Sequence, residues 1–173
     1  EINYLIGSYR KSWTVFNKHY EYAVPLLNYD MPRPDNTPVL AQVEGGLLRL
    51  NVGDRAALRR NGDRSNPDES VQLLAGTTPD SVIVAAFGMR QTFTGVRRIS
   101  VETGTGNDTV QIGEGLSMDD ILVRGGSGND VLVNLGAAPV RFFGDDGEDR
   151  LIGGRGADLL DGTEHLVVEL VAP

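Results

Sequence analysis

Four nonapeptides rich in glycine and aspartate constrain the fold of this 173-residue chain more than any other feature. They occupy residues 103–111, 125–133, 144–152 and 153–161, and are called repeats 1 to 4. Repeats 2 and 4 fit the pattern G-G-x-G-x-D-x-U-x at every fixed position, where U is a large apolar residue. Each nonapeptide predicts a glycine-rich turn followed by a very short strand, the unit of a parallel β-roll.

The spacing of apolar residues predicts a solenoid whose coils each contain two short strands. Intervals of 12, 10, 10, 9 and 9 residues separate the expected strand centres, which are Val110, Leu122, Leu132, Phe142, Leu151 and Leu160. The aspartates of repeats 1, 2 and 3 are 22 and 19 residues apart, about one coil each. We therefore expect these three turns to stack on one edge of the roll. Repeat 4 should lie on the other edge, against the turn at residues 135–139.

The predicted turns carry the oxygen ligands that Ca²⁺ prefers, of which it takes about six to eight. One turn offers carbonyl oxygens and a single carboxylate, so two stacked turns are needed to complete a site. Glycine adopts the positive φ that such turns require, and asparagine also tolerates it. The candidate metal-site residues of the four repeats are Gly104, Gly106, Asn107, Asp108, Gly126, Gly128, Asn129, Asp130, Asp145, Gly147, Asp149, Gly154, Gly156 and Asp158.

We expect one calcium site between repeats 1 and 2 and another between repeats 2 and 3. Their carboxylates would be Asp108, Asp130 and Asp149. Asp158 holds the same position in repeat 4, but its stacking partner is the degenerate turn at residues 135–139.

The four nonapeptides resemble the RTX (repeats-in-toxin) calcium-binding repeats of secreted bacterial proteins. The resemblance covers about residues 99–162, with Thr103 in place of the first glycine of repeat 1 and Asp145 in place of the second glycine of repeat 3. It implies an all-β fold, a right-handed parallel β-roll or β-helix with Ca²⁺ in its turns. It also implies type I export, folding outside the cell, and Asp108, Asp130, Asp149 and Asp158 as ligand aspartates.

The remaining sequence suggests three further segments. Residues 1–41 hold all five tyrosines and the only tryptophan, with short strands expected at residues 12–16 and 19–24 before a proline-rich stretch. They are either the last hairpin of a preceding domain with a linker, or an aromatic docking segment. Residues 42–98 predict a short antiparallel β cap, residues 99–162 the calcium roll, and residues 163–173 a closing strand. A cluster of arginines in the cap is interpreted as a solvated face, as partners for the acidic half, or as an anion site: Arg55, Arg59, Arg60 and Arg64.

Charge and composition exclude several classes of function. Residues 1–98 have a net charge of +2 and residues 99–173 a net charge of −10, within a total of −8. The acidic half argues against nucleic acid and favours a cation as partner. The chain has no cysteine and no apolar run of the roughly 20 residues that a membrane helix needs. The sequence also lacks the phosphate-loop, EF-hand, histidine–zinc and nucleophile-elbow patterns.

Two functional classes remain open. The first is a non-enzymatic structural or interaction module of a secreted or cell-surface bacterial protein of the adhesin, exoprotein or surface-layer type. Its expected partners are calcium ions and another protein or a cell-surface component. The alternative is an accessory module of an extracellular protease, lipase or polysaccharide-modifying enzyme whose catalytic domain lies outside this chain. A third interpretation is that the turns are RTX-like but empty. Because the sequence starts at Glu1, we interpret it as a processed chain or a fragment.

Overall fold

The computed structural model describes residues 39–60, 64, 67–162 and 165–170. All of them belong to one compact unit, Thr37–Pro173. The strands expected at residues 12–16 and 19–24, and most of the aromatic segment, lie outside the described residues.

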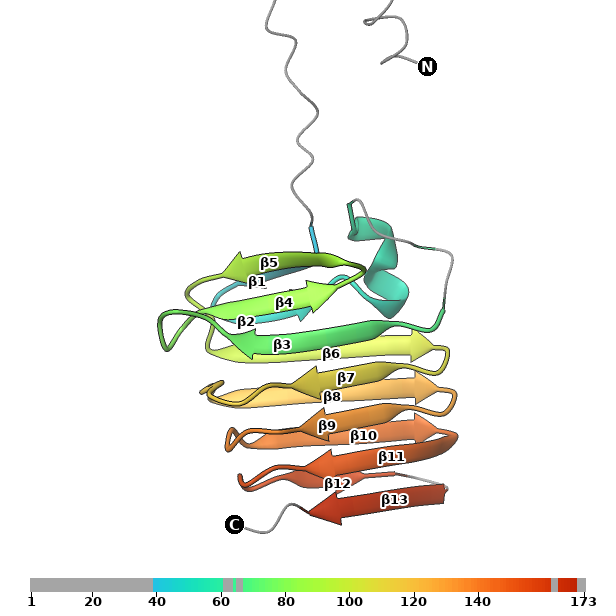
Figure 1. The fold of residues 1–173 in the computed structure, drawn as a ribbon. Coiled ribbons are helices and arrows are strands. Elements are labelled where there is room, and N and C mark those ends of the chain that lie inside the picture. The colour runs from blue at the N-terminus through green and yellow to red at the C-terminus, as the bar shows by residue number, and fades with distance from the viewer. Residues whose placement is uncertain (1–38, 61–63, 65–66, 163–164, 171–173) are drawn as a thin grey trace, which may run out of the picture. The chain divides into compact units, whose positions relative to one another are not determined.

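Two sheets face each other in this unit (Figure 1). Sheet A has the order β1 (Ala41–Glu44), β2 (Leu47–Leu50), β6 (Arg98–Thr105), β8 (Asp120–Ser127), β10 (Val140–Asp146), β12 (Leu159–Asp161). Sheet B has the order β13 (His165–Leu170), β11 (Glu148–Gly153), β9 (Val131–Asn134), β7 (Thr109–Ile112), β3 (Ser70–Ala75), β4 (Val82–Ala86), β5 (Met89–Phe93). A short 3₁₀ helix, η2 (Gly53–Leu58), lies between β2 and β3.

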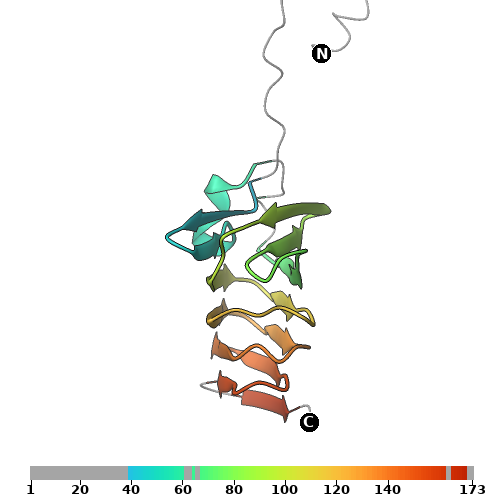
Figure 2. The same cartoon turned by 90° about the vertical axis from the view of Figure 1, so that its left-hand side faces the viewer.

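From β6 onward the chain alternates between the two sheets, so that each coil contributes one strand to each (Figure 2). Strands β2, β6, β8, β10 and β12 pair in parallel, as do β3, β7, β9, β11 and β13. The pairs β1–β2, β3–β4 and β4–β5 are antiparallel. Both sheets are therefore mixed. The expectation of an all-β fold is confirmed for the described residues, and the parallel arrangement describes part of each sheet.

The hydrophobic core lies between the sheets and is built from vertical rows of aliphatic side chains. Because strand side chains alternate in direction, every second residue faces inward. Residues in matched register fill the core at no more than 1% exposure: Ile99, Ile121 and Val140 in sheet A, and Val110, Leu132 and Leu151 in sheet B. Each such burial contributes roughly 1.5–3 kcal/mol. The rows fix the register in which the turns stack.

One expected core residue faces the other way. Leu122 lies in β8 as predicted, but Ile121 and Val123 are the residues at 0% exposure, and Leu122 is half-buried on the outer face. Because Ile121, Leu122 and Val123 are all aliphatic, the sequence does not show which of them face the core. A shift of one residue turns every side chain of a strand to the opposite face.

The parallel stack also begins earlier than residue 99. β2 pairs in parallel with β6, and β3 pairs in parallel with β7, so residues 47–75 form a first coil before repeat 1. The antiparallel strands β1, β4 and β5 are added to this coil. Among the described residues, no helix is long and apolar enough to span a membrane.

Candidate metal centre

The turns of repeats 1, 2 and 3 share one backbone conformation that depends on glycine. Gly104 and Gly106 have φ of 94° and 123°, and Gly126 and Gly128 have φ of 110° and 128°. A Cβ atom at Gly128 would collide with the carbonyl oxygen of Gly106, because successive turns are packed backbone to backbone. In repeat 3, Gly147 has φ of 134° and Asp145 adopts φ of 66° where repeat 2 has Gly126.

The aspartates of these turns form a buried column. Asp108, Asp130 and Asp149 are 1%, 1% and 3% exposed. Asp130 Oδ1 accepts the Asp108 N–H at 2.7 Å, and Asp149 Oδ1 accepts the Asp130 N–H at 2.9 Å. The three turns expected to stack on one edge are thus brought together, each aspartate reaching back to the preceding coil. We call these three residues the acidic column.

The second carboxylate oxygen of each column residue has no hydrogen-bond partner. Oδ2 of Asp108, Asp130 and Asp149 is buried and unpaired. Two of these oxygens, in Asp130 and Asp149, occupy the space that a Cβ atom would fill at Gly125 and Gly144. A buried polar atom left unpaired costs about 1–3 kcal/mol, and more when it carries charge. Carboxylate oxygens of this kind, together with main-chain carbonyl oxygens, are the ligands that Ca²⁺ prefers.

Burial also changes the acidity of the column. Desolvation raises the pKa of Asp108, and it raises the pKa of Asp130 to about 6 from an ordinary 3.8. Hydrogen bonds from the backbone act in the opposite direction, while the neighbouring carboxylates Asp108 and Asp149 raise the pKa of Asp130 further. Burial therefore disfavours the ionised forms of Asp108 and Asp130.

The asparagines before the aspartates have a different role from the one expected. Neither Asn107 nor Asn129 has a positive φ. Asn107 Oδ1 accepts the Asn129 N–H at 2.8 Å, and Asn129 Oδ1 accepts the Glu148 N–H at 2.9 Å. They form a second ladder that runs opposite in direction to the acidic column and holds successive turns in register.

Repeat 4 differs from the other three although its sequence fits the pattern completely. Neither Gly154 nor Gly156 has a positive φ, contrary to expectation. Asp158 Oδ1 accepts the Val140 N–H at 3.1 Å, and Oδ2 accepts the Gly154 N–H at 2.7 Å. This repeat packs on the turn at residues 135–139, as predicted, and both of its carboxylate oxygens are satisfied by N–H groups.

Asp145 also differs from the column residues. Its carboxylate is bound by Arg124, with Nη1 to Oδ1 at 2.8 Å, on the partly exposed outer face. Across the described ranges, no three acidic or histidine side chains converge as a ready-made metal cluster. A site at the column must therefore draw the rest of its ligands from main-chain carbonyls.

Sequence reasoning missed that the hydrogen-bond ladder of the acidic column continues into the coil before repeat 1. Glu69 donates its N–H to Asp108 Oδ1 at 2.6 Å, and Asp68 Oδ1 accepts the Asn107 N–H at 2.8 Å. Asp68 and Glu69 thus stand above Asn107 and Asp108 in the first coil. The signal was present in the sequence, since Glu69 precedes Val71 by two residues as Asp108 precedes Val110.

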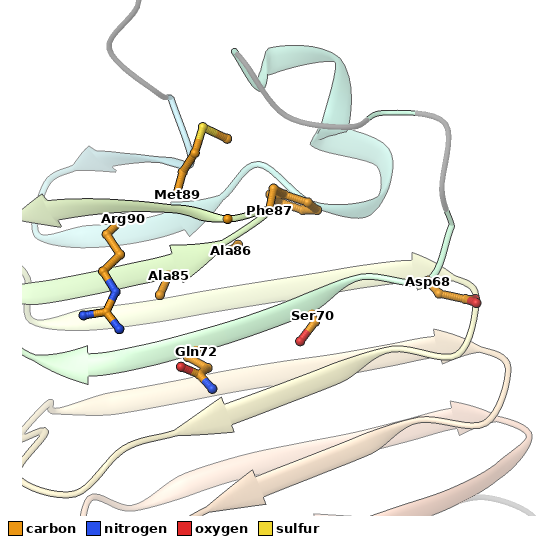
Figure 3. Close-up of a pocket in the computed structure, with 9 residues that line it drawn as sticks. Asp68, Ser70, Gln72, Ala85, Ala86, Phe87, Met89 and Arg90 are labelled. Atoms are coloured by element: carbon orange, nitrogen blue, oxygen red, sulfur yellow. The ribbon is translucent and has the colours of Figure 1, made fainter.

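A shallow pocket lies on the outer face of β3 and β4 (Figure 3). Asp68 stands at one end and Arg90 at the other, with Ser70, Gln72 and Ala85 between them. None of its lining residues belongs to the four repeats.

The fold and the stacked acidic turns define a repeat protein whose coils are joined through buried carboxylates. A family model, the RTX calcium-binding nonapeptide repeat, matches residues 119–133 and 141–164 with four copies. This segment of the chain is built from RTX repeats. Repeat 1 lies outside the matched residues but stacks in the same column. Neither a curated protein nor a solved structure matches the chain.

Proposed function

We propose that the repeats form a right-handed calcium-binding β-roll whose ions lie between repeats 1 and 2 and between repeats 2 and 3. The observation that carries this proposal is the set of three stacked, buried Oδ2 atoms without a hydrogen-bond partner, in Asp108, Asp130 and Asp149. Repeat 4 is left out of these sites because Asp158 is satisfied by its own turn and by Val140.

Electrostatics supports coupling between calcium and folding. Two carboxylates about 4 Å apart repel each other by roughly 4 kcal/mol at an effective dielectric of about 20. A divalent cation between two turns converts this repulsion into attraction, and its binding energy adds to the folding energy. The roll should therefore gain most of its stability when calcium binds.

The proposed role is that of a calcium-rigidified structural or interaction module in a secreted or cell-surface bacterial protein. RTX repeats are typical of such proteins, and the four copies in residues 119–164 support this assignment. The proposal assigns no catalytic step to the chain, and its partners beyond calcium would be another protein or a cell-surface component.

Direct titration tests the proposal. The full chain, stripped of metal on a chelating resin, is titrated with Ca²⁺ and separately with Mg²⁺, while far-UV circular dichroism and heat of binding are followed. We expect a gain of β signal and measurable binding with Ca²⁺ and little response to Mg²⁺, which demands near-octahedral geometry. Absence of calcium binding in the millimolar range would refute the proposal.

A further inference from the structure

The first coil continues the ladder of the acidic column with a glutamate, Glu69. The turn between β2 and β3 lies directly before repeat 1, because these strands pair in parallel with β6 and β7. At the end of this turn, Glu69 donates its N–H to Asp108 Oδ1, as Asp108 donates to Asp130. Glu69 therefore holds in the first coil the position that the aspartates hold in the next three turns.

The carboxylate of Glu69 differs from the carboxylates of the acidic column because both of its oxygens accept hydrogen bonds. Arg59 Nη1 donates to Oε1 at 2.7 Å, and the Gly53 N–H donates to Oε2 at 2.9 Å. The Arg59 and Glu69 side chains are 0% and 3% exposed. One edge of the stack thus begins with the buried Glu69 carboxylate, which is paired with Arg59. The three aspartates of the acidic column follow it, and each has an unpaired oxygen.

The guanidinium is held on several sides. Nη1 of Arg59 lies 3.4 Å from the carbonyl oxygen of Asn51, and the guanidinium carbon lies 3.8 Å from the centroid of the Phe87 ring. Phe87 follows β4 and lies beside η2 (Figure 3). Arg59 follows η2 directly, and this helix is an insertion that the short turns of repeats 1, 2 and 3 lack. The guanidinium is part of the chain itself, so a chelator that strips bound metal does not remove it.

We infer that Arg59 is a built-in cation that takes the place of calcium at the first turn of the column. The first coil and its antiparallel strands then fold without calcium and present a finished sheet edge on which the repeats assemble. Calcium dependence begins with repeat 1. This inference rests on the proposed function, because a stand-in for calcium requires that calcium bind in the turns below.

Hydrogen–deuterium exchange on the full chain tests the inference, with metal-stripped protein compared with protein in saturating Ca²⁺. We expect the amides of β3 and β4 to stay protected in both states, while those of β8, β9 and β10 lose protection when calcium is removed. Loss of protection in β3 and β4 together with the repeats would overturn the inference and leave the proposed function intact. If no strand responds, the calcium-dependent roll itself is wrong, and the inference falls with it.

Substitution of the arginine separates a stand-in cation from an ordinary core ion pair. In Arg59→Met, Glu69 is left unpaired like the column aspartates, so β3 and β4 should lose protection without calcium and regain it when calcium is added. The double variant Arg59→Met/Glu69→Gln removes both charges and should keep β3 and β4 protected without calcium. Arg60→Met, at the exposed neighbouring position, is the matched control and should behave as the unmodified chain.

Two results with these variants would refute the stand-in role. One is unchanged protection of β3 and β4 in calcium-free Arg59→Met. The other is a loss of protection in Arg59→Met that calcium does not restore, which would mean that Arg59 only packs the core.

Discussion

Asp130 stands in the middle of the acidic column, with hydrogen bonds to the turns of both neighbouring coils. It contributes to both proposed calcium sites, whereas Asp158 contributes to neither. We predict that Asp130→Asn weakens calcium binding by roughly 10–100-fold or more, since it removes a ligand charge and not only a supporting group. Asp158→Asn should leave the affinity nearly unchanged. Isothermal titration of both variants provides the measurement, and equal small effects would contradict the stacking of the sites.

The raised pKa of Asp130 predicts an unusual pH dependence for the calcium-free protein. A carboxyl whose pKa is about 6 in the folded state and near 3.8 when unfolded binds its proton more tightly in the folded state. Its contribution to stability is fully present below about pH 4 and is lost as the pH rises through 6. Asp108 acts in the same direction, since burial raises its pKa too.

We therefore expect the melting temperature of metal-stripped protein to fall between about pH 4 and pH 6, as followed by scanning calorimetry. Asp130→Asn should flatten this decline, because the amide does not titrate. In saturating calcium the trend should reverse, since protons compete with the ion for the same carboxylates. A melting temperature of the stripped protein that rises across this range would contradict the assignment.

The strands of the inner rows allow a test of stability at the level of single elements. Leu132 is at 0% exposure in β9, between Val110 and Leu151, while Val133 faces outward beside it. We expect Leu132→Ala to lower the unfolding free energy in calcium by about 2–5 kcal/mol, the range for large-to-small changes in a core. Val133→Ala, the control on the same strand, should cost well under half as much. Urea unfolding measures both.

The sequence predicts most elements of the repeat region, because turn chemistry and apolar spacing specify the same structure. All six expected strand centres lie in strands. Val131, Val133 and Ile152 face outward, in alternation with the buried Leu132 and Leu151. The sequence could not show whether Leu122 faces the core or the outer side, because both of its neighbours in the chain are also apolar.

The conformation of repeat 4 could not be predicted from its own residues. Its nine residues fit the pattern better than those of repeat 3, yet only repeat 3 adopts the shared turn. The difference lies in the surface on which each turn packs. Repeat 3 stacks on repeat 2, while repeat 4 stacks on a turn that contains Asn134 and Pro139, and Asn134 Nδ2 donates to the Ala138 carbonyl there. The neighbouring turn on which repeat 4 packs decides its backbone conformation. The nonapeptide pattern carries no information about that neighbour.

The first coil could not be predicted from the sequence either, because η2 is inserted in its turn. The insertion separates Gly53 from Glu69, so the spacing that identifies repeats 1, 2 and 3 is absent. The arginine cluster was interpreted as a solvated face, as partners for the acidic half, or as an anion site. Arg59 is instead fully buried and pairs with Glu69, which lies outside the acidic half.

At the scale of the whole molecule, calcium binding as proposed makes the stability depend on the calcium concentration. A ligand that binds only the folded state stabilises it by RT ln(1 + [L]/Kd), about 2.7 kcal/mol at one hundred times Kd. We predict that the melting temperature of the full chain rises with the logarithm of calcium concentration, with a slope that corresponds to two ions. Differential scanning fluorimetry over a calcium series measures this slope. A slope that corresponds to no bound ion would contradict the two proposed sites.

The order of the strands also has a mechanical consequence. Strands β1 and β5 end the two sheets on one side and β12 and β13 end them on the other. The hydrogen bonds between the parallel strands of successive coils are evenly spaced and slanted, and they connect each coil to the next. A force along the stacking axis would break the hydrogen bonds between one pair of coils before those of the next pair. Coils would therefore detach one at a time. With calcium bound as proposed, each ion ties two coils across the plane that such a force opens. We therefore expect the resistance of the module to pulling to depend on the calcium concentration around it.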